Sequence, residues 1–308
     1  MPKVVIAGSI NMDVVAYARR LPLPGETIHA EKLEYFPGGK GLNQAIASAR
    51  YGASTMLAGK VGEDDAGIRL LAYLKENGVD VSLIGTSGKE HTGTALITVA
   101  GDKNTIVVAG GANMELSPKD AQRIPLSPND IVVSQFETPL PFVTALFVRG
   151  HANETINILN PSPARKIPRG LMRATDILVV NETELGMLAE AAIKENASAS
   201  RIVRHAASIA THRGQRIVVT LGKRGQISVM DGKHAEHPPR QARRAVDPTA
   251  AGDCFLGNLA GGLAENRSFD AAMEFASAAA AMSVEVKGAA PSLPAHAAIL
   301  KRFPELRS

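Results

Sequence analysis

The segment TAAGDCFLG, residues 249–257, places one carboxylate, Asp253, at the start of a stretch of small and apolar residues. A helix that begins here leaves its first-turn N–H groups without intrahelical partners, beside the positive end of the helix dipole. These groups suit a developing anion, and a carboxylate in the same turn can take the proton of an attacking hydroxyl. Phosphoryl transfer needs that combination. The N–H groups concerned belong to Ala250, Ala251, Gly252 and Asp253. On these residues alone, an Asp253 that only satisfies helix N-terminal donors is an equally good interpretation.

A second glycine-rich segment, FPGGKGLNQA at 36–45, also leads into a predicted helix. Its glycines, among them Gly39, let the backbone approach a ligand closely at the helix entry. Lys40 and Asn43 are then placed to face that ligand. A plain glycine-rich turn is the alternative interpretation.

The segment GSINMD at 8–13 brings Asn11 and Asp13 directly after a buried strand. Such residues often bond only to their own turn, which is the alternative for each of them. Together with Lys40, Asn43 and Glu137, however, they supply the mixed donors and acceptors that several adjacent sugar hydroxyls demand. The sequence therefore favours a polyol site.

Two further segments suit the nucleotide end of such a site. In NETE, Asn181 and Glu184 stand three residues apart, close enough on one helical turn to address the same hydrated cation. Glu182 and Glu184 could equally be solvated acids at a helix start. The segment TLGKRG at 220–225 is a tight glycine turn that suits a nucleotide, with a simple hairpin turn as its alternative.

The elements that must position these residues are short β-branched runs alternating with helical stretches. Nearly continuous hydrophobicity indicates strands buried on both faces of a parallel sheet, and we predict one doubly wound α/β domain over 1–308. Ile68, Leu71 and Leu74 form the predicted buried stripe of one helix. Ligands bind at the carboxyl ends of such strands, where the polar segments above lie. The predicted strands open the segments 4–9, 55–62, 130–137, 155–163, 176–184 and 216–225, each of which ends in turn residues.

Segments 12–36 and 91–109 alternate polar and apolar residues instead, and GDKN at 101–104 is typical of a hairpin turn. We predict a small antiparallel lid sheet over the main domain. An open sheet edge invites association, so the lid is also the predicted surface of a homodimer.

Composition and missing motifs exclude several other classes. The chain of 308 residues is 45% apolar with a net charge of +4, and its arginine-rich region 201–254 has no aromatic residue for base stacking. Neither nucleic acid nor a membrane is expected as a partner. One cysteine allows no internal disulfide, which fits the cytoplasm. The chain has no G-x-x-x-x-G-K-[ST], G-x-G-x-x-G, His-Glu-x-x-His or G-x-S-x-G motif.

Taken in order, these motifs resemble those of the ribokinase-like (PfkB) carbohydrate kinases over nearly the whole chain, through to KGAAPSLP near the C-terminus. The resemblance implies that Asp253 is the catalytic base for the sugar's primary hydroxyl, with D-ribose phosphorylated by ATP at its 5-hydroxyl. It assigns the 250–253 backbone as anion hole and Glu184 as the residue that organises water around Mg²⁺. It implies that the sugar is bound by Asn11, Asp13, Gly39, Lys40, Asn43, Glu137 and Asp253, and the nucleotide by Asn181, Thr220, Gly222, Gly225 and Gly252.

The same family implies a monovalent cation, usually potassium, beside the anion hole. The corresponding positions are Asp247, Thr249, Ser283, Val286, Gly288 and Ser292. Val286 stands where arginine is common and Thr249 where isoleucine is common. Several ligands at these positions are backbone carbonyls, so such changes need not abolish the site.

Three alternatives to ribose phosphorylation stay open at this point. The acceptor could be deoxyribose, fructose or a nucleoside such as adenosine, although 4% aromatic residues offer little for a base pocket. A non-catalytic sugar or nucleotide sensor is disfavoured because the base and the anion hole are both present. A nicotinamide dehydrogenase lacks its phosphate fingerprint.

Overall fold

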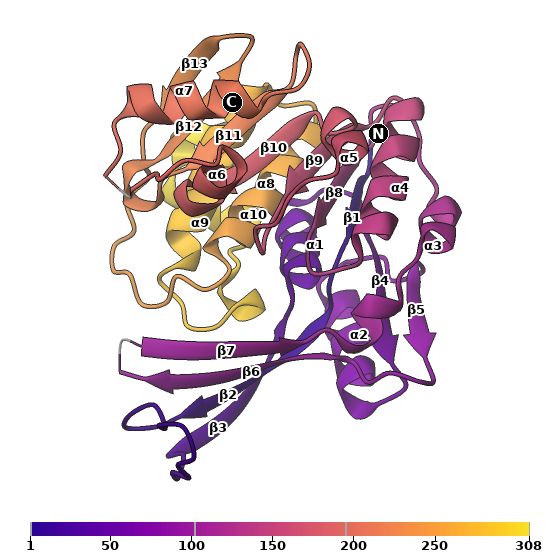
Figure 1. The fold of residues 1–308 in the computed structure, drawn as a ribbon, viewed down its shortest axis with the longest axis vertical. Coiled ribbons are helices and arrows are strands. Elements are labelled where there is room, and N and C mark those ends of the chain that lie inside the picture. The colour runs from indigo at the N-terminus through magenta and orange to yellow at the C-terminus, as the bar shows by residue number, and fades with distance from the viewer. Residues whose placement is uncertain (1, 102, 195, 308) are drawn as a thin grey trace.

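The computed structural model describes residues 2–101, 103–194 and 196–307, and its centre is a nine-stranded sheet (Figure 1). Strands β11 through β5 of this sheet run parallel, and β12 and β13 extend one edge antiparallel. The predicted strands are therefore confirmed, whereas β5, β12 and β13 were not predicted. In spatial order the strands are β13 (Lys233–His237), β12 (Gln226–Met230), β11 (Arg216–Thr220), β10 (Ile177–Asn181), β9 (Ile156–Asn160), β8 (Ile131–Gln135), β1 (Val4–Ala7), β4 (Thr55–Gly62) and β5 (Ile84–Ser87).

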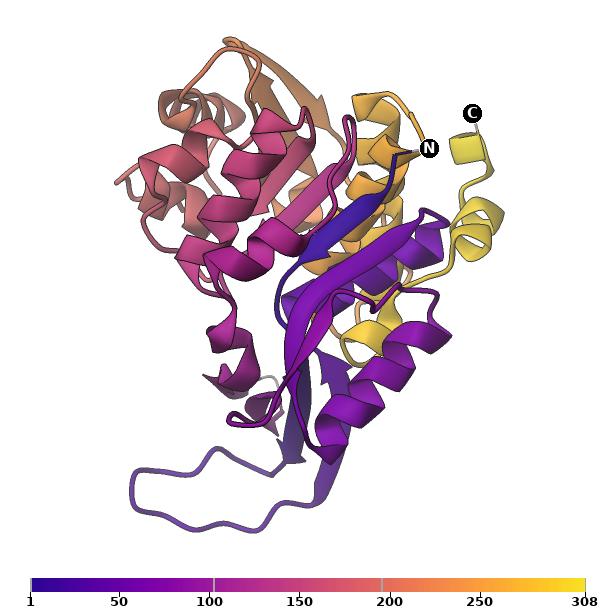
Figure 2. The ribbon, with the colours of Figure 1, turned by 90° about the vertical axis from the view of Figure 1, so that its right-hand side faces the viewer.

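Helices cover both faces of the sheet, because successive strand side chains point to opposite sides. In β1, Val4 and Ile6 belong to one core and Val5 and Ala7 to the other. Figure 2 shows the resulting helix, sheet and helix layers edge-on. The first core includes α1 (Lys40–Tyr51), α2 (Asp65–Glu76), α8 (Ala251–Ala264), α9 (Phe269–Ser283) and α10 (His296–Arg302). The second includes α3 (Pro118–Arg123), α4 (Leu140–Ala152), α5 (Arg169–Arg173), α6 (Glu182–Leu188) and α7 (Ala199–Ile209).

The predicted apolar stripe of α2 is wrong at one position. Ile68 is 68% exposed, whereas Leu70 and Leu74 are fully buried. Gly67 packs tightly against the end of β4, where an added Cβ would meet the Gly62 carbonyl oxygen at 2.4 Å. This contact turns the Gly67 side of the helix inward, and the next residue, 100° further round, points to solvent.

Four short 3₁₀ helices complete the described chain, and η1 and η2 lie near the site. None of the helices in the described ranges combines the length and apolarity needed to cross a bilayer. The 3₁₀ helices are η1 (Gly111–Glu115), η2 (Gly222–Arg224), η3 (Ala290–Ser292) and η4 (Pro304–Arg307).

The predicted lid is a four-stranded sheet that projects from the main body (Figure 1). Its order is β3 (Lys32–Gly38), β2 (Asn11–Tyr17), β6 (Gly93–Ala100) and β7 (Lys103–Ala109). The β2–β3 and β6–β7 pairs are antiparallel, while β2 and β6 pair in parallel. The predicted GDKN turn includes residue 102, which lies outside the described residues, but the pairing of Ala100 with Lys103 confirms a hairpin.

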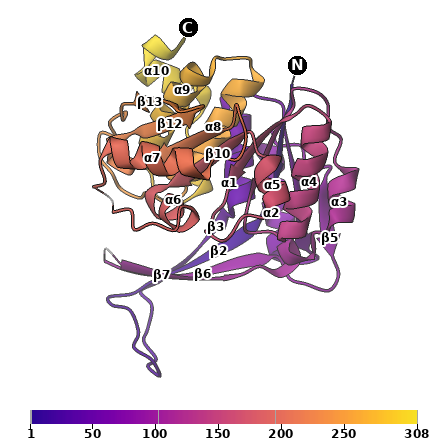
Figure 3. The same ribbon diagram turned by 45° about the horizontal axis from the view of Figure 1, so that its top comes forward.

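Strands occupy only the two ends of the first predicted lid segment. Residues 18–31 contain no strand and form a loop that extends away from the body (Figure 3). Two prolines and a Pro-Gly pair in LPLPGE account for this, because proline cannot donate to a strand ladder.

Candidate active site

The site lies where the strand order reverses between β1 and β8, at the carboxyl ends of both strands. Ligands of open α/β sheets bind at such a switch point. Ser9, just after β1, donates from Oγ to Oε2 of Glu137, just after β8, at 2.5 Å. The backbone N–H of Lys40 donates to the same carboxylate oxygen at 3.3 Å. These bonds join the β1 loop, the β8 loop and the start of α1.

Asp253 lies in the first turn of α8, and Ala250 makes the bend before it with a left-handed φ of +60°. Two amides bind its carboxylate: Gln44 Nε2 donates to Oδ1 at 2.8 Å and Asn43 Nδ2 to Oδ2 at 3.1 Å. Burial raises the pKa of Asp253, while the charge of Lys40 and the two amides oppose that rise. The carboxylate is thus held in a fixed orientation among donors.

The predicted sugar ligands Asn11 and Asp13 lie on β2, beside the start of α1. Burial, followed by the charges of Glu137 and Asp253, raises the pKa of Asp13 to about 7. A Cβ on Gly38 would meet the Asp13 carboxylate at 2.2 Å, so glycine is required at that neighbouring position. Asn11 Oδ1 accepts a hydrogen bond from Asn113 Nδ2 of η1 at 2.8 Å. The lid thereby contributes directly to this part of the site.

Asn43 carries the clearest sign of a missing ligand. Its Nδ2 is bonded to Asp253, but its buried Oδ1 has no hydrogen-bond partner among the described residues. A buried acceptor without a partner is costly, so a donor such as a sugar hydroxyl fits there.

The ammonium group of Lys40 lies among carboxylates from three elements. Burial acts to lower its pKa, but the charges of Asp253, Glu137 and Glu184 outweigh burial and the pKa is raised. Lys40 therefore stays protonated and offers a fixed positive charge at the point where the sugar and nucleotide parts of the site meet.

A pocket of about 170 Å³ connects these residues to the nucleotide side. It includes Lys40, Asp253 and the backbone of 250–252 from the α1 and α8 starts, with Asn181, Glu184 and Thr220 from the ends of β10 and β11. Of the predicted residues, Gly222 and Gly225 do not line it, and neither do the sugar ligands Asn11, Asp13, Gly39, Asn43 and Glu137. The structure thus forms two adjoining halves that share Lys40 and Asp253.

Within the predicted anion hole, the backbone groups differ. The Ala251 N–H already donates to the Pro248 carbonyl at 3.2 Å. A Cβ on Gly252 would meet no atom within 4 Å, so the space beside that residue is open. The N–H groups of Ala250, Gly252 and Asp253 are therefore better placed than that of Ala251 to receive an anion.

The NETE segment forms a capping box at the start of α6. Asn181 Oδ1 accepts from the Glu184 N–H at 2.8 Å, and Glu184 Oε2 accepts from the Asn181 N–H at 2.9 Å. Glu182 instead pairs with Arg224 at 2.6 Å. The described ranges contain no group of three His, Cys, Asp or Glu side chains arranged to hold a metal. Magnesium, which takes oxygen ligands and keeps several waters, fits Glu184 as a single carboxylate in the pocket that Gly252 also lines.

The predicted monovalent-cation residues come from two regions, 247–249 before α8 and 283–292 from the end of α9 to η3, which are joined by Asp247. Its Oδ1 accepts from Thr249 Oγ1 at 2.6 Å and its Oδ2 from the Gly288 N–H at 2.9 Å. Ser283 and Ser292 donate their hydroxyls to backbone carbonyls three residues earlier, whereas the Val286 side chain is 48% exposed. Asp247 thus brings its carboxylate together with the Thr249 hydroxyl, and oxygen ligands of this kind suit a hard cation.

Sequence reasoning missed four polar residues of the site: Ser9, Gln44, Asn113 and Gln135. Asn113 holds Ile10 and Asn11, and Gln135 Nε2 donates to Gln44 Oε1 at 2.5 Å. Ser9 and Gln44 lie inside segments already singled out. No local signal marks Gln135, whose contact depends on the distance between strand and helix.

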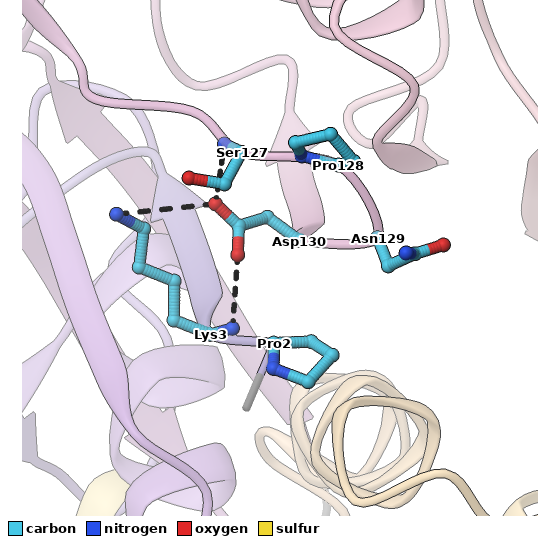
Figure 4. A pocket seen from close by; sticks show the side chains of 6 residues that line it. All are labelled: Pro2, Lys3, Ser127, Pro128, Asn129 and Asp130. Atoms are coloured by element: carbon cyan, nitrogen blue, oxygen red, sulfur yellow. Dashed lines mark hydrogen bonds and ion pairs between the residues drawn. The ribbon is translucent and has the colours of Figure 1, made fainter.

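A larger hollow of about 390 Å³ lies at the opposite, amino ends of β1 and β8 (Figure 4). Its Asp130 carboxylate accepts from the N–H groups of Lys3 at 3.0 Å and Ser127 at 2.8 Å. The Ser127 bond closes the turn before β8, and the Lys3 bond joins that turn to the residue before β1, so the Asp130 carboxylate holds the two strand starts together.

Comparison with known proteins gives full-length matches. The family described as pfkB family carbohydrate kinase matches residues 1–296. The ribokinase of Staphylococcus aureus (strain COL) is 36% identical over 299 residues, covering 95% of this chain and 96% of that protein. A bifunctional ribokinase/ribose-5-phosphate isomerase A of Fructilactobacillus sanfranciscensis is 36% identical over 97% of this chain, which spans 56% of that longer protein. The structure of Arabidopsis thaliana ribokinase complexed with ribose and ATP has a TM-score of 0.88 at 30% identity, covering 100% of this chain and 99% of that one.

Proposed function

The chain belongs to the pfkB family of carbohydrate kinases, and from this premise we propose that it transfers the γ-phosphate of ATP to the 5-hydroxyl of D-ribose. The observation that carries the proposal is the junction of the two half-sites. Asp253, Lys40 and the open space beside Gly252 belong to one pocket. This pocket lies between the buried residues proposed to bind the sugar and the ends of strands β10 and β11. A base, a cation and an anion cradle are thus adjacent.

In this mechanism Asp253 takes the proton from the acceptor hydroxyl as its oxygen attacks the γ-phosphorus atom of ATP. The bond from that phosphorus to the β-phosphate oxygen breaks, and ADP leaves. The first-turn N–H groups of α8 and the ammonium group of Lys40 stabilise the charge that builds on the transferred group. Asn11, Asp13, Gly39, Lys40, Asn43 and Glu137 hold the other hydroxyls, so that the reacting oxygen is fixed near Asp253. Positioning of this kind replaces a bimolecular encounter and lowers the barrier.

The nucleotide occupies the other half, at Asn181, Thr220, Gly222, Gly225 and Gly252. Glu184 would hold magnesium through water, and the ion would supply neutralisation of phosphate charge. A monovalent cation, potassium in our proposal, is held at Asp247, Thr249, Ser283, Val286, Gly288 and Ser292. Asp247 supports this part because its carboxylate connects the loop before α8 with the 283–292 region.

The function is tested by ADP release from Mg·ATP with ribose, deoxyribose, fructose, adenosine or no acceptor, each in sodium and in potassium. We expect a ribose-selective rate that rises with potassium. Selectivity for another acceptor would show that ribose is not the substrate but would leave the phosphoryl-transfer chemistry in place. ADP release that no acceptor stimulates would count against the proposal that the protein is a sugar kinase.

We also propose a homodimer through the lid. Cross-strand neighbours Tyr35, Val14, Leu96 and Val107 share one face of the lid sheet. Tyr35, Leu96 and Val107 are exposed there, whereas Val14 is partly buried against the first core. Adjoining exposed apolar side chains of this kind mark association surfaces. Light scattering at micromolar concentration should give twice the chain mass, and Val107→Lys should shift it towards the monomer. A wild-type monomer would refute the dimer.

A further inference from the structure

Behind the base lies a line of buried amide groups. Gln135 ends β8, Gln44 lies in the second turn of α1, and Asp253 lies in the first turn of α8. Gln135 Nε2 donates to Gln44 Oε1 at 2.5 Å, and Gln44 Nε2 donates to Asp253 Oδ1 at 2.8 Å. Both glutamines are fully buried, so bulk water does not compete for these bonds.

The order of these bonds determines which way the Gln44 amide faces. A glutamine side chain has one acceptor end and one donor end. Because the Gln135 donor occupies the Gln44 oxygen, the NH₂ group of Gln44 faces the Asp253 carboxylate. Without Gln135, the Gln44 amide could rotate and present its oxygen to a negative charge, which would repel it.

Two glycines keep this line short. A Cβ on Gly8 would lie 2.1 Å from Gln135 Oε1, and a Cβ on Gly257 would lie 2.4 Å from the Gln44 carbonyl oxygen. The missing side chains let β1 lie against Gln135 and let α8 lie against α1. The three residues therefore have little room to move relative to one another.

We propose that Gln44, oriented by Gln135, is a positioning residue that holds the Asp253 carboxylate ionised and in line with the acceptor hydroxyl. The inference rests on the proposed function of Asp253 as base. Gln44 is bonded to Oδ1, while Asn43 is bonded to Oδ2 and keeps its own oxygen for a ligand. The two amides therefore have different tasks: Asn43 faces the sugar, and Gln44 serves the base alone.

The test compares the pH dependence of kcat/KM in wild type, Gln44→Met and Gln135→Met. Methionine keeps the length of the side chain and removes the amide. Losing a donor to the buried carboxylate favours the protonated base, so the acid limb of the Gln44→Met profile should move to higher pH. At pH values below that limb, kcat/KM of Gln44→Met should be roughly 10- to 100-fold lower than that of wild type. This factor corresponds to the free energy of a hydrogen bond to a charged group. Gln135→Met should shift the same limb by less.

The matched control is Gln215→Met. Gln215 is also buried, and its Nε2 donates to the carbonyls of Met172 at 3.0 Å and Thr175 at 2.8 Å, before β11 and far from the base. This variant loses buried hydrogen bonds but should keep the wild-type limb. Circular dichroism of all three variants establishes whether they fold.

A uniform loss of activity at every pH, with the limb unmoved in Gln44→Met, would overturn the proposal and leave Gln44 a packing residue. If Gln44→Met does not fold, Gln135→Met decides, because it keeps the Gln44 side chain; an unmoved limb there overturns the proposal. An inactive wild type would instead contradict the proposed function.

Discussion

The sugar half and the nucleotide half of the site are built in opposite ways. In the sugar half, buried side chains bond to one another: Ser9 to Glu137, and both Asn43 and Gln44 to Asp253. The predicted contacts of the nucleotide half are largely backbone and glycine, around Gly252 and Gly222, together with the capping box of Asn181 and Glu184.

The buried charged groups are therefore concentrated in the sugar half, whereas the nucleotide half leaves open space. Burial, joined by the charges of neighbouring carboxylates such as Glu137, raises the pKa of both Asp13 and Asp253 in the sugar half. On the nucleotide side, what matters is room for an anion beside a helix start. Sensitivity to pH should therefore originate in the sugar half and sensitivity to side-chain bulk in the nucleotide half.

The largest effect is expected where the two halves meet. Asp253→Asn keeps the side-chain shape but removes the base, so kcat should fall by at least about 10²- to 10⁴-fold. ADP release with saturating ribose measures the loss, and circular dichroism should remain that of wild type. Turnover near that of wild type would show that another group takes the proton.

Gly252→Ala tests the nucleotide half by adding one methyl group without changing any charge. An added Cβ meets no atom within 4 Å and alanine favours helix, so the melting temperature should not fall. The methyl group would occupy the space proposed for the transferred phosphate, and kcat should fall about 10²-fold, as when an oxyanion contact is lost. A fully active variant would move the anion elsewhere.

Asp13→Asn tests the sugar half by charge. Losing an ionised acceptor should lower kcat/KM for ribose by roughly 10- to 100-fold. The unliganded protein should become more stable, because the ionised Asp13 is buried at a cost.

The raised pKa of Asp13 determines how the stability gain of Asp13→Asn varies with pH. The folded-state pKa of about 7 lies above the ordinary 3.8, so the wild-type penalty is absent below about pH 4 and complete above about pH 7. The gain in melting temperature of Asp13→Asn should therefore be greater at pH 8 than at pH 5. An equal gain at both values would contradict the raised pKa.

Glu184→Gln should have the smallest effect. Glutamine keeps an oxygen that can accept from the Asn181 N–H, so the capping box and the fold should persist. The Mg²⁺ concentration for half-maximal activity should rise about 10-fold, as when an outer-shell partner of a metal is lost. Titration of activity with Mg²⁺ measures this, and an unchanged curve would leave Glu184 a structural cap.

Much of this arrangement could be predicted from local pattern. Continuous apolar runs identified the core strands, because strands covered on both faces must be apolar throughout. The segments around Lys40 and Asp253 were found because glycine and small residues before a helix have a specific backbone purpose. The edge strand β13 was missed because its described side chains are mostly exposed and polar, so KHAEH has no hydrophobic signature.

The sequence by itself determined most of the element types, the family and the position of Asp253 in its helix turn, since each depends on residues close together in the chain. Only the tertiary structure decided which atoms meet across more than a hundred residues, as Ser9 does with Glu137 and Gln44 with Asp253. Those contacts depend on how closely α1, α8 and β8 approach one another, a distance that packing determines and that no local pattern records.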